Sequence, residues 1–302
     1  MNRASHPVVE LRGLSKSFGD TRAVRELNLS IPAGMVYGLI GPNGAGKSTT
    51  IKVIMGGLRA TSGSVRVAGL DPIADAGKVK PIVGYVPEVH HICRWMRAGE
   101  AVRFCRGLYP TWNDSLCDSL LDQFGIERSK KVRHLSKGTL VKLALTLALS
   151  HEPELLVMDE PTSGLDPMIR EELMDGVLRN MCDGRRTVLF SSHTLSDVQR
   201  LADRIGIIGS GELLVDLPVD ELLRSTKLVR AVLCDGRLPA ACPSGTIFER
   251  VDRREWSLTI RDYSPDRLEE LRSANPVEHV EVCDLTLEEI FKAYVRGRRA
   301  TA

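Results

Sequence analysis

The sequence predicts an α/β fold with a mostly parallel sheet, an antiparallel β layer and a helical subdomain, followed by a small C-terminal α+β domain. Three observations lead to this prediction. Apolar runs typical of buried strands alternate with helical patterns, which indicates parallel strands joined by crossover helices. A mostly helical insert occupies about residues 95–150. After about residue 223 the pattern changes to shorter strands, so we expect one domain over 1–223 and an accessory domain over 224–302.

The elements of the first half follow from local patterns. VVELRGL (8–14) and AVRELNLSI (23–31) alternate like antiparallel strands, whereas MVYGLI (35–40) is continuously apolar, like a buried strand. STTIKVIMGGL (48–58) has helical spacing that stops at two glycines. SGSVRVAGLD (62–71) is expected to form a hairpin, and KPIVGYVPE (80–88) a strand that ends at a loop.

The second half continues the alternation. The remaining expected helices are 100–109, 115–126, 139–150, 168–182, 194–202, 265–273 and 285–295. The remaining expected strands are 154–161, 186–193, 204–213, 228–234, 245–251, 255–261 and 277–283.

Composition restricts the class of protein. The chain has 302 residues, 43% of them hydrophobic, which is enough for a packed core. Lys and Arg number 41 against 39 Asp and Glu, so no overall field attracts nucleic acid, and we expect no nucleic-acid partner. The N-terminus has no apolar signal segment, and no run approaches the roughly 20 apolar residues of a membrane span. These features predict a cytoplasmic protein, and seven scattered cysteines agree with reduced thiols.

The stretch GLIGPNGAGKST (38–49) joins an expected strand to an expected helix and has the pattern of a phosphate-binding loop. Gly41, Gly44 and Gly46 allow backbone N–H groups to surround phosphates, and the helix N-terminus adds positive partial charge. Lys47 is expected to reach the β and γ phosphates, and the Ser48 hydroxyl to bind Mg²⁺. Because strand and helix flank the loop as required, a merely structural glycine-rich turn is a poor alternative.

Two carboxylates end the apolar strand LLVMDEP (155–161). Asp159 is expected to hold Mg²⁺, and Glu160 to polarise the water that attacks the γ phosphate. SGLD (163–166) follows directly, and SSH (191–193) ends the next strand, which places His193 where an imidazole could contact the γ phosphate. Together with the glycine loop, these residues predict a nucleotide hydrolase with Glu160 and His193 as catalytic residues.

These motifs, in this order over about residues 8–223, resemble the ATP-binding cassette (ABC) ATPases, the motor subunits of ABC transporters. GPNGAGKST resembles the Walker A motif, LLVMDEP the Walker B motif, SGLD the D-loop, and His193 the switch histidine. The resemblance implies a P-loop NTPase cassette with ATP and Mg²⁺ as ligands. ATP is preferred over GTP because the chain has no NKxD motif to recognise guanine.

The resemblance also assigns contacts to ATP. Phe18, in KSFGD, matches the aromatic residue that stacks on adenine, the alternative being a core phenylalanine at a turn. The expected ATP contacts are Phe18, Gly41, Asn43, Gly44, Ala45, Gly46, Lys47, Ser48, Thr49, Ser136, Gly138 and Asp166. The expected metal ligands are Ser48, Glu88 and Asp159.

Two motifs depart from the family pattern. The signature LSGGQ is here LSKGT (135–139), in which Ser136 can still cap the apolar helix that follows. In the family this segment closes over ATP held by the opposite subunit, which implies a homodimer. Lys137 either adds charge at the γ phosphate or lies on the surface, and the sequence leaves both open. Glu88 replaces the usual Q-loop glutamine and keeps an oxygen ligand, although it adds negative charge beside the phosphates.

GYVPE, LSKGT, LYPTW (108–112) and the C-terminal domain together resemble the ATP-binding subunits of type-2 bacterial ABC exporters, including small drug or antimicrobial-peptide exporters. The resemblance implies a separate transmembrane permease, contacted by the loop and helical insert from His90 to about Pro110, and a location on the inner face of the cell membrane.

Three other classes are less consistent with the sequence. A nontransport ABC switch that acts on ribosomes usually has two cassettes in tandem, and this chain has one. A DNA-repair ATPase needs a long coiled-coil insertion, but no sustained heptads follow the glycine loop. A P-loop kinase has no reason to contain LSKGT and SGLD. The nontransport switch with a ribosome or DNA partner is the main alternative.

Overall fold

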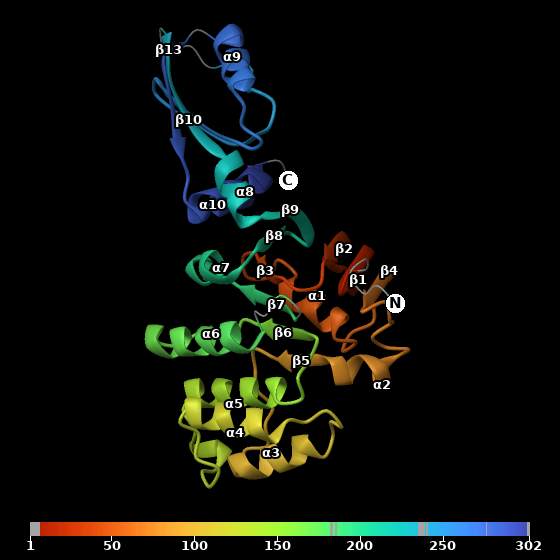
Figure 1. Cartoon of the computed structure of the whole chain (residues 1–302). Helices are drawn as coiled ribbons and strands as arrows, with labels where there is room; N and C mark the ends of the chain where they lie inside the picture. The colour runs from red at the N-terminus through yellow and green to blue at the C-terminus, as the bar shows by residue number, and fades with distance from the viewer. Residues whose placement is uncertain are drawn as a thin grey trace. The chain divides into compact units, whose positions relative to one another are not determined.

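The computed structural model describes residues 7–181, 184, 186–234, 239, 241–275 and 277–300. The chain divides into two compact units, residues 1–216 and 217–302 (Figure 1). This division lies within the last strand of the first unit's sheet, earlier than the boundary that the sequence suggests after residue 223. The short helix α8 (Val219–Ser225), which the sequence analysis does not anticipate, therefore belongs to the second unit.

The first unit contains a six-stranded sheet with the strand order β5-β6-β7-β3-β8-β9. Its strands are β3 (Val36–Ile40), β5 (Val83–Val86), β6 (Leu155–Asp159), β7 (Thr187–Ser192), β8 (Arg204–Gly209) and β9 (Glu212–Pro218). Strands β5, β6, β7, β3 and β8 pair in parallel. All residues of β3, β6 and β7 are buried, which explains their continuous apolar runs. The predicted parallel sheet is confirmed.

Three antiparallel strands form a second layer in the order β2-β1-β4. They are β1 (Val9–Phe18), β2 (Thr21–Ile31) and β4 (Ser62–Val67). The predicted hairpin at 62–71 is wrong, because β4 pairs with β1 and only a single bridge joins Val67 to Leu70. Helix α1 (Lys47–Ile54) contacts both this layer and β6, and one core of buried apolar side chains connects them.

The predicted helical insert consists of α3 (Ala98–Arg106), α4 (Asp114–Gln123) and α5 (Lys137–Leu149). Helix α5 packs directly on the edge strand β5, and α3 and α4 contact α5 on its side away from the sheet (Figure 1). Helix α5 is buried over most of its length, as its run of leucines and alanines predicts. The other helices of this unit are α2 (Ala76–Val79), α6 (Pro167–Met181) and α7 (Leu195–Leu201), with short 3₁₀ turns at Lys80–Ile82 and Val132–His134. None of the helices in the described ranges combines the length and apolar content that crossing a bilayer requires.

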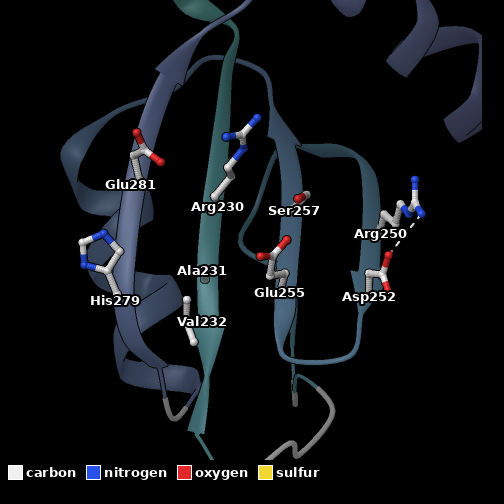
Figure 2. A pocket seen from close by; sticks show the side chains of 9 residues that line it. All are labelled: Arg230, Ala231, Val232, Arg250, Asp252, Glu255, Ser257, His279 and Glu281. Atoms are coloured by element: carbon white, nitrogen blue, oxygen red, sulfur yellow. Dashed lines mark hydrogen bonds and ion pairs between the residues drawn. The ribbon is translucent and has the colours of Figure 1, made fainter.

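The second unit is a four-stranded antiparallel sheet with the order β11-β12-β10-β13 and two further helices. Its remaining elements are β10 (Lys227–Leu233), β11 (Thr246–Asp252), β12 (Glu255–Ile260), β13 (Val277–Asp284), α9 (Pro265–Ala274) and α10 (Leu287–Ala300). Alternate residues of β10 and β12, among them Trp256, face a core that includes Leu271 of α9. The opposite face of β10, β12 and their neighbours is largely polar (Figure 2).

Candidate functional site

The glycine loop lies between β3 and α1, and its backbone path leaves no room for side chains at several of its glycines. Gly44 and Gly46 have φ angles of +78° and +105°, which side chains rarely adopt. A Cβ atom on Gly46 would lie 2.4 Å from the Ala23 carbonyl oxygen, and one on Gly41 would lie 2.4 Å from that of Ile208. The loop can therefore follow this path only with glycine at these positions.

Lys47, the first residue of α1, is buried and points back into this loop. Its ammonium group donates a hydrogen bond to the Gly41 carbonyl oxygen at 2.8 Å. It also forms an ion pair with Oε1 of Glu160 at 3.1 Å, and the two side chains are only 6% and 8% exposed. The structure thus joins the lysine of the glycine loop to the predicted catalytic base.

Asp159 ends β6 and receives two hydroxyl hydrogen bonds on one carboxylate oxygen. Ser48 Oγ donates from α1 at 2.9 Å, and Ser191 Oγ donates from the end of β7 at 2.7 Å. Asp159 is 2% exposed, so this carboxylate is held in a fixed position by groups from two other elements.

Glu160 follows β6 in a strained backbone conformation, with φ of +49°. A left-handed conformation costs a residue other than glycine about 1–2 kcal/mol, so local interactions must hold it. The Glu160 N–H donates to Ser191 Oγ at 2.9 Å. Its carboxylate oxygen Oε2 lies 2.6 Å from His193 Nδ1 and accepts a hydrogen bond from the His193 N–H at 3.2 Å. A continuous chain of polar contacts therefore runs from Lys47 through Glu160 to His193.

The donor set fits Mg²⁺. Mg²⁺ prefers oxygen ligands and usually binds one or two protein groups together with substrate phosphates. Ser48 and Asp159 supply such oxygens side by side. No group of three or more His, Cys, Asp or Glu side chains within the described ranges could hold a metal, so such a site depends on phosphate oxygens. Glu88 is exposed in the loop after β5. Burial of the Tyr85 side chain, together with the negative charges of Asp159 and Glu88, raises the pKa of Tyr85 to about 12.

Phe18 ends β1 and is 49% exposed, so its interpretation as a core residue is wrong. The Lys16 ammonium lies 5.0 Å from the centroid of the Phe18 ring, a cation–π contact. An exposed ring is free to accept a stacked base, as the predicted role requires.

The signature and D-loop segments form the starts of two helices. Ser136 caps α5 as predicted, since its Oγ accepts a hydrogen bond from the Thr139 N–H at 3.1 Å. Asp166 Oδ1 accepts one from the Ile169 N–H at 3.0 Å at the start of α6. These hydrogen bonds stay within their own helix starts, and among the described residues neither side chain is hydrogen-bonded to the glycine loop.

Comparison with known proteins gives a consistent result. The family model described as ABC transporter matches residues 24–163. The chain is 32% identical over 223 residues to the bacitracin transport ATP-binding protein BcrA of Bacillus licheniformis, covering 73% of this chain and 72% of that protein. The chain belongs to the ABC transporter family of ATP-binding proteins. It is accordingly an ATPase, the ATP-hydrolysing motor subunit of a transporter, as the sequence predicts.

Two further similarities agree with membership of the ABC transporter family. The chain is 33% identical over 276 residues to the daunorubicin/doxorubicin resistance ATP-binding protein DrrA of Streptomyces peucetius, covering 89% of this chain and 82% of that protein. This match is too long to fit within the first unit, so it includes part of the second. A solved ATP-binding subunit of an ABC transporter is 26% identical, with a TM-score of 0.66 over 72% of this chain and 92% of that one. The predicted cassette fold is confirmed.

Sequence analysis of this ABC ATPase missed the part that Ser191 plays. Ser191 is fully buried and bonds both Asp159 and the backbone of Glu160. A signal was present, because a hydroxyl at the end of the apolar run TVLF needs a buried partner. The sequence analysis predicts a role for His193, two residues later, but it is Ser191 that connects Asp159 and Glu160.

Proposed function

We propose that this chain hydrolyses Mg-ATP as a homodimer and drives a separate transmembrane permease in a bacterial exporter, located on the inner face of the cell membrane. The observation that carries the proposal is the buried chain of contacts from Lys47 to Glu160 to His193, beside the pair formed by Ser48 and Asp159. The similar proteins from Bacillus licheniformis and Streptomyces peucetius are named for bacitracin transport and for daunorubicin/doxorubicin resistance, which supports export of an antimicrobial or drug-like compound.

The roles of the side chains follow from their positions. Lys47 leaves Glu160 for the β and γ phosphates when ATP enters, because phosphates carry more negative charge than one carboxylate. Glu160 is then free to accept the proton of the attacking water, and His193 holds its carboxylate from the other side. Ser48 and Asp159 would hold Mg²⁺, which neutralises charge on the phosphates when bound. Phe18 would stack on adenine, and Asn43 and Ala45 of the loop, together with Thr49 of α1, would supply backbone contacts.

Dimerisation completes the site in this proposal. Ser136, Gly138 and Asp166 make no hydrogen bond to the glycine loop of their own chain in the described structure, and we assign them to ATP held by a second copy. ATP binding favours the closed dimer because it adds contacts that the open form lacks. Hydrolysis removes those contacts and allows reopening, which the permease senses through the loop after β5 and the helices α3–α5.

The test compares wild type with Glu160→Gln at saturating Mg-ATP. We expect the ATPase rate of the variant to fall by about 10²-fold or more, since a general base contributes 10²–10⁴-fold. The variant should still form an ATP-dependent dimer, measured by light scattering. Glu255→Gln, an exposed carboxylate in the second unit, serves as the matched control and should keep the wild-type rate. Turnover that survives in Glu160→Gln would contradict the proposed role of Glu160.

A further inference from the structure

Lys137 of the LSKGT segment binds the D-loop of its own chain. Its ammonium group donates a hydrogen bond to the backbone carbonyl oxygen of Ser163 at 2.6 Å. The N–H of the same residue, Ser163, donates to the carbonyl oxygen of Glu160 at 3.1 Å. Two hydrogen bonds thus connect the start of α5, through one turn of backbone, to the residue that we propose as the catalytic base.

The next residue makes room for this lysine. Gly164 has φ of +66°, and a Cβ atom placed on it would lie 2.7 Å from the Lys137 ammonium nitrogen. The ammonium group therefore occupies the space that a side chain at this position would need. Glycine in SGLD allows both the turn and the contact with Lys137.

The position of Lys137 is unfavourable for helix α5 alone. It is the first residue of α5, where the helix dipole presents positive partial charge, and the first turn has no acidic residue. A cation there destabilises the helix, because it lies close to the positive end of the helix dipole. The hydrogen bond to Ser163 offsets this cost, which indicates that the lysine serves the D-loop rather than the helix that contains it.

Helices α5 and α6 also pack against each other next to the Lys137 contact. A Cβ atom on Gly138 would lie 2.7 Å from Cγ2 of Ile169, so α5 and α6 approach closely behind the two loops. Farther along the same helices, the buried Lys142 forms an ion pair with Glu172. The Lys137 contact therefore extends an existing interface between α5 and α6 to the loops at its end.

We propose that Lys137 is a positioning residue that binds the D-loop to the signature segment, so that the two segments facing the partner's ATP move together and transmit its presence to Glu160. This inference rests on the proposed function, since it needs the homodimer. Of the two roles that the sequence left open, the inference assigns Lys137 to the D-loop and not to the γ phosphate, because its ammonium group donates to Ser163.

The experiment measures steady-state ATPase kinetics of the full chain as Lys137→Met, Lys137→Arg and Gly164→Ala, with Lys130→Met as the control. Lys130 is an exposed lysine of the same helical region, so its variant removes an equal charge. We expect Lys137→Met to lower kcat about tenfold, within the range of ordinary coupling energies, and to leave the KM for ATP unchanged. The Hill coefficient for ATP should fall toward one, because each site no longer senses the other.

The other variants separate positioning from a loss of charge. Lys137→Arg should recover most of the rate, since a guanidinium can donate to the same carbonyl oxygen. Gly164→Ala should lower kcat at least as much as Lys137→Met, because a Cβ atom there displaces the ammonium group and also strains the turn at φ of +66°. Lys130→Met should behave as wild type.

Two results would overturn the inference. An unchanged kcat in Lys137→Met would show that the D-loop needs no such contact. A raised KM for ATP with unchanged kcat would show that Lys137 contacts the nucleotide instead. Glu160→Gln, measured in the same series, distinguishes failure of this inference from failure of the proposed function. If Glu160→Gln keeps its turnover, the proposed function fails. If Glu160→Gln loses turnover while Lys137→Met keeps the wild-type kcat, only this inference is refuted.

Discussion

Two ion pairs of similar length illustrate the contrast between the two units. Lys47 and Glu160 lie 3.1 Å apart with side chains 6% and 8% exposed, whereas Arg250 and Asp252 lie 3.3 Å apart with side chains 70% and 63% exposed. The first pair lies among backbone carbonyls and loops of the proposed ATP site. The second lies on the open sheet face of the second unit, beside Ser257 and Glu255 (Figure 2).

The two ion pairs have similar N–O distances, so it is their burial that distinguishes a functional site from a solvated surface. Water screens charges on the open face, so each side chain there can be changed with little effect. At the proposed ATP site each buried charged group depends on a neighbour, because an unpaired buried charge is costly. The following expectations test this contrast, beginning with the largest effect.

The ion pairs themselves give the largest expected difference in the free energy of unfolding. Lys47→Met leaves Glu160 buried without its cation and should cost about 3 kcal/mol without nucleotide. Arg250→Met should cost no more than about 0.5 kcal/mol. Urea unfolding measures both. The double variant Lys47→Met with Glu160→Gln should regain much of the loss, and equal costs for the two single variants would remove the contrast.

Removing one hydroxyl group from each unit should give a smaller difference in the free energy of unfolding. Ser191→Ala removes the acceptor of the Glu160 N–H and one donor to Asp159, and should cost about 1–3 kcal/mol. Ser257→Ala, on the open face between Arg250 and Arg230, should change stability by less than about 0.5 kcal/mol. Thermal unfolding without nucleotide checks both, and a Ser191→Ala protein as stable as wild type would mean that the bridge between the carboxylate residues is dispensable.

The smallest expected effect concerns pH. His151 is 1% exposed and stacks on Tyr109, and burial lowers its pKa. Since the unfolded chain takes up a proton below about pH 6.5 that the folded protein resists, stability is complete above that pH and falls as pH decreases below it. His151→Phe should lose less stability than wild type between pH 7 and pH 5. Parallel pH curves for the two proteins would contradict a contribution from His151.

Much of the proposed ATP site could be predicted because its motifs have few structural solutions. Gly44, Gly46 and Lys47 lie between a buried strand and a helix as expected, and Asp159 meets Ser48 as expected. The strain at Glu160 could not be predicted, since neither residue type nor spacing encodes a φ angle. The Lys137 contact depends on how α5 meets α6, which is a tertiary property.

The differences between the predicted and the observed fold also come from tertiary structure. Residues 62–71 have the alternation and turn of a hairpin, yet their first strand pairs with β1, far away in the sequence. Alternation shows that a segment is a strand but not which strand is its neighbour. The sequence suggests a domain boundary after residue 223, at a change of pattern, and the compact units divide a few residues earlier, within β9.

The φ angle of +49° at Glu160 has an evolutionary consequence. Glycine would adopt this backbone angle without strain, but it would leave the buried Lys47 without its anion, at a cost of about 3 kcal/mol against about 1–2 kcal/mol for the left-handed backbone. Selection for thermal stability therefore keeps a carboxylate here in spite of the strain, and the residue that we propose as the catalytic base also stabilises the protein without nucleotide.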